Sequence, residues 1–251
     1  MSQWYKLTFK QLQPINLGYK KHGVINETRI FITGQSIWGA LTNVYGKEKG
    51  WTKSDYKNQQ NQKLFENITC FYPKIGDGEV LYPKYQDGEF YLGEMSEREF
   101  RYEFVTTYLS TAISPNSLNA KDESLHEIDI ILPQDKDEKK QFFWVGYLKI
   151  DEDIEIPKEI YIGSDSRYGF GLMRLEGEPI EENFDYEVVK GKYNNNDYPK
   201  NEPISNFVEF NNQKFIGELE LLAEFDFSEN RPKVKQNSSA FYITVGSSIN
   251  D

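Results

Sequence analysis

The chain has 251 residues, of which 38% are hydrophobic and 15% aromatic, so it can fill a hydrophobic core and is predicted to be globular. Its net charge of -11 argues against a free-standing nucleic-acid-binding protein, although a locally basic groove is compatible with this value. A single cysteine excludes an intrachain disulfide and a cysteine-based zinc site, and with only His22 and His126 as histidines we expect no metal or other cofactor.

The hydropathy pattern bears on location and on fold class. No apolar run approaches the length needed to cross a bilayer, and the first residues do not form a basic and apolar leader. We therefore expect a cytoplasmic protein without membrane contact. The 17 tyrosines and 17 phenylalanines favour a sheet-rich structure, because aromatic side chains fit the pleated surface of a sheet.

The N-terminal part predicts a strand and then a polar segment. Residues 5–12 alternate between apolar and polar positions, which is typical of a strand. The segment 18–28 follows and is locally basic. Its candidate functional residues are Lys20, Lys21 and His22.

A helix is predicted next, because apolar residues recur at helical spacing at Ile37, Ala40, Leu41 and Val44. Ser36 is the expected N-cap and Gly46 the expected end. Gln35 and Ser36 would then lie beside free amides at a helix N-terminus, which attract anions. The alternative is that Gly34 only tightens a turn and that Ser36 only caps the helix.

The middle of the chain reads as an insertion, a hairpin and further strands. Residues 51–66 are polar and predict a surface helix or part of the insertion, which spans about 47–100. Gly-Asp-Gly and Asp-Gly turns separate short predicted strands. The predicted strands of this region are 70–72, 79–82, 89–92, 103–109, 128–132 and 142–150, with a hairpin-like excursion at about 110–128.

The segment 163–171, which we call the glycine loop, interrupts an apolar stretch with three glycines, two serines and Arg167. Glycines let a ligand approach the backbone amides, and the guanidinium fork of Arg167 suits phosphate oxygens. The alternative is a tight turn or bulge without a ligand. Beyond it we expect an exposed loop at 194–206, a strand or short helix at 214–227 and a last strand at 240–245.

Three segments in this order resemble the RAMP superfamily of CRISPR-associated proteins, in particular the small RAMP subunits of type III effector complexes. They are Phe-Ile-Thr-Gly-Gln-Ser-Ile-Trp-Gly at 31–39, the series from 111 to 127, and the glycine loop. The resemblance implies an α+β fold: a ferredoxin-like antiparallel sheet of the RNA-recognition type with helices on one face. A single domain would span 1–251, and the hairpin at 110–128 would be thumb-like.

The resemblance also implies a function, that of a non-catalytic RNA-binding subunit which grips the guide RNA backbone and helps to position the guide–target duplex. Its partners would be guide RNA, target RNA, other RAMP subunits and a large polymerase-like subunit. The residues expected to bind RNA are Lys20, Lys21, Gln35, Ser36, Ser164, Ser166 and Arg167. The residues expected to act as apolar wedges of the thumb are Ile113, Pro115 and Leu118.

The sequence departs from the family pattern at Thr33, where proline is usual, and at Ser114, where aspartate is usual. Target-cleaving relatives use an aspartate before the first helix, whereas residues 18–34 contain none and offer Asn26 and Glu27. We therefore expect no target cleavage. One alternative is a RAMP endoribonuclease with His22 as general acid or base. A second is a β-rich scaffold or ligand-binding protein without an RNA role.

Overall fold

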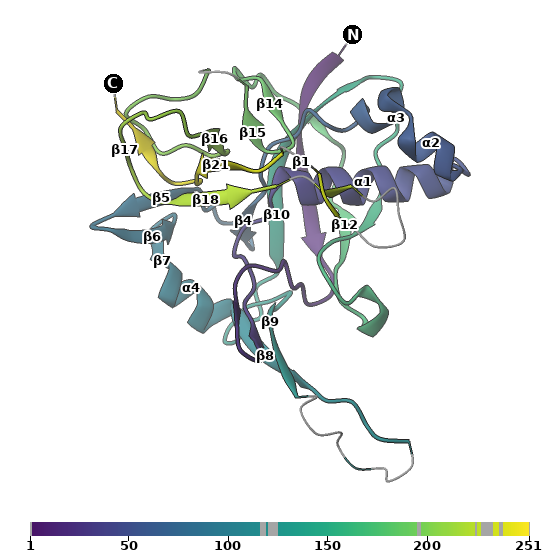
Figure 1. Ribbon diagram of the computed structural model, residues 1–251, viewed down its shortest axis with the longest axis vertical. Coiled ribbons are helices and arrows are strands. Elements are labelled where there is room, and N and C mark those ends of the chain that lie inside the picture. The colour runs from purple at the N-terminus through teal and green to yellow at the C-terminus, as the bar shows by residue number, and fades with distance from the viewer. Residues whose placement is uncertain are drawn as a thin grey trace.

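The computed structural model describes residues 2–115, 119, 125–194, 197–223, 225–226, 233–235 and 238–250. They form an α+β structure with mostly antiparallel sheets and few helices (Figure 1). Within this part of the chain, no helix is both long enough and apolar enough to span a membrane.

The main sheet has the strand order β11-β12-β1-β10-β4, with β13 also paired to β1, and every neighbouring pair is antiparallel. Its long central strands alternate in burial, so that Leu7 and Phe9 of β1 and Trp144 and Leu148 of β10 face the core. The strands are β1 (Ser2–Gln11), β4 (Tyr72–Ile75), β10 (Phe142–Asp151), β11 (Glu159–Tyr161), β12 (Leu172–Leu175) and β13 (Ile180–Glu181).

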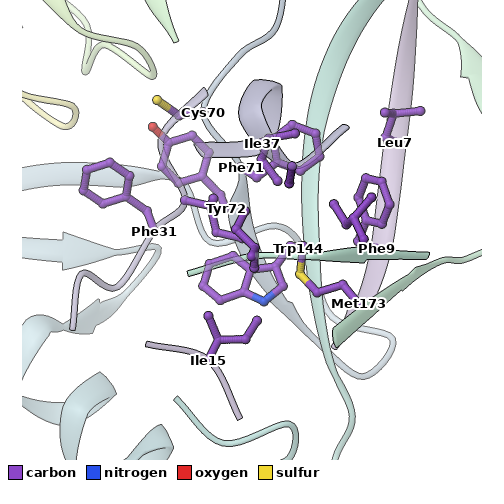
Figure 2. Packing of buried hydrophobic residues seen from close by; sticks show 14 of the residues in the cluster. Leu7, Phe9, Ile15, Phe31, Ile37, Cys70, Phe71, Tyr72, Trp144 and Met173 are labelled. Atoms are coloured by element: carbon purple, nitrogen blue, oxygen red, sulfur yellow. The ribbon is translucent and has the colours of Figure 1, made fainter. Parts of the chain in front are cut away.

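Helix α1 (Gly34–Glu48) covers this core face of the sheet, and α2 (Lys53–Lys57) and α3 (Gln59–Lys63) follow it (Figure 1). Figure 2 shows Ile37 of α1, Phe71, and Leu7 and Phe9 of β1 as members of one buried cluster, in which the ring centroids of Phe9 and Phe71 are 6.1 Å apart. The predicted apolar face is confirmed, because Ile37 and Leu41 are fully buried.

The predicted ends of α1 are wrong. Thr33 is the N-cap, because its Oγ1 accepts a hydrogen bond from the Ser36 amide at 3.3 Å. The helix also continues past Gly46, which lies inside it and packs against Trp51 and Tyr56. Gly46 is thus required for close packing rather than for ending the helix.

A buried amide joins the main sheet to the next sheet. Trp144 Nε1 donates to Gln11 Oε1 at 3.0 Å, and Gln11 Nε2 donates to the Ile131 carbonyl at 2.9 Å. Both side chains are fully buried, so each polar atom needs such a partner.

The second sheet has the order β2-β3-β9-β8, in which β3 and β9 are parallel. Strands β8 and β9 form a hairpin, called the long hairpin below, that extends away from the body of the molecule (Figure 1). The four strands are β2 (Lys21–His22), β3 (Ile25–Asn26), β8 (Val105–Ser110) and β9 (His126–Ile131).

Helix α4 (Glu97–Phe104) leads directly into β8, so the strand predicted from residue 103 begins two residues later. A capping box between Ser96 and Glu99 starts the helix, and Phe100 and Phe104 are its buried residues. The remaining strands between α3 and α4 are β5 (Pro83–Gln86), β6 (Glu89–Leu92) and β7 (Met95–Ser96), which make a three-stranded sheet. Strand β4 also lies within residues 47–100, yet it pairs with β10 in the main sheet.

The C-terminal part forms several small sheets around its own apolar cluster, which includes Trp4, Ile204 and Ile243. The exposed loop predicted at 194–206 is wrong at its end, because Ile204 and Asn206 are buried and Asn206 Oδ1 accepts from the Cys70 amide at 2.8 Å. The strands are β14 (Val188–Val189), β15 (Lys192–Tyr193), β16 (Val208–Glu209), β17 (Phe215–Ile216), β18 (Leu219–Leu222), β19 (Phe225–Asp226), β20 (Lys233–Val234), β21 (Ala240–Ile243) and β22 (Ser248–Ile249).

An ion pair ties this C-terminal part to the segment before α1. Both terminal nitrogens of Arg29 donate to the carboxylate of Glu220 on β18, and the two side chains are only 12% and 22% exposed. The guanidinium also lies over the rings of Tyr19 and Phe31, at 4.6 and 5.0 Å from their centroids.

We predict that Arg29→Ala lowers the free energy of unfolding by about 2–3 kcal/mol, because it leaves the partly buried Glu220 carboxylate unpaired. Urea unfolding measures this as a lower midpoint at an unchanged slope. The matched control is Lys140→Ala, which removes an exposed pair with Glu138 and should leave the midpoint unchanged. Equal midpoints for Arg29→Ala and the unaltered chain would contradict the prediction.

Candidate nucleic-acid interface

The glycine loop lies between β11 and β12, and its centre is the single 3₁₀ turn η1 (Ser166–Tyr168). Gly163 and Gly171 have φ values of +82° and +94°. A Cβ atom would overlap the Asn16 carbonyl oxygen at Gly163 and the Ile162 carbonyl oxygen at Gly171. These two glycines are therefore needed for a positive φ and also for close backbone approach.

Asn16 holds the glycine loop in place. Its side chain is 3% exposed, and its Nδ2 donates to the Asp129 carbonyl of β9 at 2.7 Å. Its Oδ1 accepts from the Gly18 amide at 3.1 Å and from the Ser164 hydroxyl at 3.0 Å. One buried amide therefore connects the glycine loop, the long hairpin and the start of the polar segment.

The predicted residues of the glycine loop differ in what they can do. The Ser164 hydroxyl is engaged by Asn16 and by the Asp165 carboxylate, so it positions the loop. Ser166 and Arg167 are exposed on η1, and within the described part of the chain Arg167 forms no ion pair. Tyr168 beside them is 74% exposed, and the sequence reasoning missed this ring.

Residues 19–27 form a short hairpin, called the basic hairpin. Two backbone hydrogen bonds of 2.9 Å close it: the Tyr19 amide donates to the Glu27 carbonyl, and the Glu27 amide donates to the Lys20 carbonyl. A hydrogen bond with Tyr19 raises the pKa of Lys20 above its usual value, against a smaller lowering by burial. Lys20 lines a cavity of about 650 Å³ that Arg29 also borders. Lys21 is exposed on β2.

His22 belongs to the basic hairpin, with 62% of its side chain exposed. Its Nε2 lies 3.8 Å from Glu27 Oε1 on the same hairpin. This is an ion-pair distance and is longer than a hydrogen bond.

The long hairpin packs against the glycine loop through Phe170, which forms a small buried cluster with Ile128 and Ile130 of β9. The Phe170 ring also meets Tyr108 of β8 edge to face, with 5.5 Å between the centroids. The glycine loop, the basic hairpin and the base of the long hairpin therefore form one surface.

Of the predicted wedge residues, Ile113 is 64% exposed and Pro115 is also exposed. Leu118 lies outside the described residues.

Gln35 and Ser36 lie at another place, on the first turn of α1, where Ser36 is exposed and Gln35 is half-buried. Their neighbour is the turn between β14 and β15, because a Cβ at Gly34 would overlap the backbone of Gly191. The Lys190 ammonium lies 4.0 Å from the centroid of the Trp38 ring on α1. Sequence reasoning missed Lys190, since nothing in its local sequence links it to this helix.

No protein-family model and no curated protein matches the chain. Solved structures do match: the chain shares its α+β fold with protein chains found in type III-B complexes. One is a chain of the cryo-EM structure of the Type III-B Cmr-beta bound to cognate target RNA and AMPPnP, state 1. It has a TM-score of 0.63 and 16% identity over 97% of this chain and 85% of that chain.

A second match is a chain of the Type III-B Cmr-beta bound to cognate target RNA, with a TM-score of 0.63 and 14% identity over 97% of this chain and 86% of that chain. The shared fold agrees with the resemblance to RAMP proteins drawn from the three sequence segments.

We predict that Gly163→Ala destabilises the protein more than Gly169→Ala does. Both positions have positive φ, but a Cβ at Gly169 meets no atom within 4 Å. Gly169→Ala should cost about 1–2 kcal/mol of backbone strain, and Gly163→Ala a further 1–3 kcal/mol, roughly, of overpacking. Thermal unfolding of both variants measures the difference, and equal losses would show that the glycine loop does not press against Asn16.

Proposed function

We propose that the chain is a non-catalytic RNA-binding subunit of a type III CRISPR interference complex, which grips the guide RNA backbone and helps to position the guide–target duplex. The observation that carries the proposal is the shared fold over 97% of the chain with chains of complexes solved with cognate target RNA. The sequence segments that resemble RAMP proteins add independent support.

The strand order of the main sheet supports a ferredoxin-like fold as part of this proposal. Taking β1, β4, β10 and β12 as the four strands in chain order, their spatial order is fourth, first, third, second. Helix α1 connects the first strand to the second, as that fold requires. Between β10 and β12 the described chain has β11 and η1 where the fold usually has a second helix.

The surface made by the glycine loop and the two hairpins suits an RNA backbone. Arg167 can bind a phosphate through two parallel hydrogen bonds, and the Ser166 hydroxyl can donate or accept beside it. Lys21 adds a second exposed cation, and Tyr168 offers a ring on which a base can stack. The long hairpin would act as the thumb, with Ile113 and Pro115 as apolar wedges at the duplex.

The partners follow from the same proposal: guide RNA, target RNA, other RAMP subunits and a large polymerase-like subunit, in the cytoplasm. The isolated chain should bind RNA weakly, because affinity for the phosphate backbone depends mainly on positive charge and the chain has a net charge of -11. Neighbouring subunits would extend the groove and supply most of the grip.

The absence of aspartate from residues 18–34 supports a subunit that does not cleave RNA. The alternative of an endoribonuclease would rely on His22, which has Glu27 as a nearby carboxylate at 3.8 Å. An exposed histidine held on a short hairpin has little to fix its position or to exclude water, so we favour the non-catalytic role.

We predict that Arg167→Ala lowers the affinity for single-stranded guide RNA roughly 5- to 15-fold at 0.1 M salt, through loss of a charge-assisted phosphate contact. A Lys20→Ala/Lys21→Ala double variant should weaken binding and reduce its salt dependence. Fluorescence anisotropy measures both, with the chain alone and with partner subunits. The control is Lys57→Ala, which removes an exposed lysine from α2. If neither variant changed RNA affinity, the surface assigned to RNA here would be wrong. If the chain bound no RNA, alone or with partner subunits, the β-rich scaffold without an RNA role would be favoured.

We predict that His22→Ala and Glu27→Gln give the same result as the unaltered chain in a cleavage assay with a radiolabelled CRISPR transcript, because neither side chain acts on the RNA. Binding of the same transcript serves as the control for folding. Cleavage by the unaltered chain that His22→Ala abolishes while binding is retained would establish the endoribonuclease instead.

A further inference from the structure

A basic row crosses the face of the main sheet that lies opposite α1. The register pairs Glu159 with Arg174, Arg174 with Lys10, Lys10 with Phe143 and Phe143 with Lys74. Directly paired residues of an antiparallel sheet point to the same face, so these five side chains lie side by side. The next row along the strands points the other way: Gln11, Phe142, Met173 and Ile160 are fully buried, and Ile75 at its end is half-buried.

Two of the three cations in this row have no acidic partner among the described residues. Arg174 pairs with Glu159 at 2.8 Å, but within the described residues Lys10 and Lys74 form no ion pair. Lys10 instead lies directly opposite Arg174, and like charges in that position are destabilising. In a chain with a net charge of -11, this arrangement favours an anionic ligand.

An aromatic ring lies in the centre of the row. Phe143 is on β10, one strand, or about 5 Å, from Lys10 on one side and from Lys74 on the other. It is partly exposed and belongs to none of the hydrophobic clusters formed by the described residues. Tyr161, two residues after Glu159 on β11, lies on the same face and is also exposed.

We propose that Lys10, Phe143 and Lys74 of this row are a second contact for single-stranded RNA, separate from the glycine loop. A base stacks on Phe143, and the ammonium groups of Lys10 and Lys74 bind the phosphates on either side of it. A nucleotide offers a phosphate to the cations and a base to the aromatic ring. An acidic partner or a purely apolar partner would offer only one of the two. The inference rests on the proposed RNA-binding function and extends it to the open face of the sheet.

The test is binding of a labelled 20-nucleotide single-stranded RNA to the full chain, measured over a range of salt concentrations. Lys10→Ala/Lys74→Ala should weaken binding and lower the log–log salt slope by about 1.4, since each phosphate contact on a single strand contributes about 0.7. Phe143→Ala should weaken binding roughly 5- to 100-fold, and Phe143→Tyr, which keeps the ring, should restore it.

The matched control is Lys53→Ala/Lys57→Ala, which removes two exposed lysines from α2 and should change neither value. Circular dichroism of each variant shows whether the fold is kept. As a direct readout, RNA carrying 5-iodouridine should form a photo-crosslink to Phe143 in the intact chain, whatever the effect of the substitutions on stability.

The outcomes separate the two proposals. If Arg167→Ala weakens binding while the Lys10/Lys74 and Phe143 variants do not, and no crosslink reaches Phe143, the glycine loop binds RNA and this inference is overturned. If the unaltered chain binds no RNA alone or with its partners, both proposals fail. If Lys10→Glu/Lys74→Glu changes the sedimenting mass but not RNA affinity, the row is a protein interface and the inference is again overturned.

Discussion

The surface proposed to bind RNA depends on the buried side chain of Asn16. Its amide donates to β9 and accepts from both the amide of Gly18 and the hydroxyl of Ser164. Three segments that are distant in sequence therefore share one small polar group, which is nearly inaccessible to water. A buried amide that lost one of these partners would carry an unsatisfied polar atom, so the three segments are held in a single arrangement.

The two faces of the main sheet have different roles because of the alternation along β1 and β10. One face supplies Leu7, Phe9 and Trp144 to the core under α1 (Figure 2). Gln11 links that core to β9. The other face is covered near Trp4 by the C-terminal part of the chain. The row at Lys10 and Phe143 lies at the other end of these strands and stays partly exposed.

Much of this arrangement follows from local sequence. Alternation predicts β1 and helical spacing predicts the buried face of α1, because burial on one side imposes these periods. The mostly aromatic and apolar residues of β10 also favour a strand. Helix α4 was missed, since only two of its eight residues are buried and its other residues are mostly charged. The register that aligns Lys10, Phe143 and Lys74 joins three distant strands, and Lys190 reaches Trp38 only through tertiary contact, so no local pattern marks them.

The close approach of Gly34 and Gly191 has a consequence for how this chain can diverge. A side chain at either position would overlap the backbone of the other segment, so the two positions are limited together although they lie in different halves of the sequence. Among diverging copies of this protein, we expect the two glycines to persist as a pair while their neighbours vary, and a substitution at one to be tolerated only when the whole turn moves away from α1.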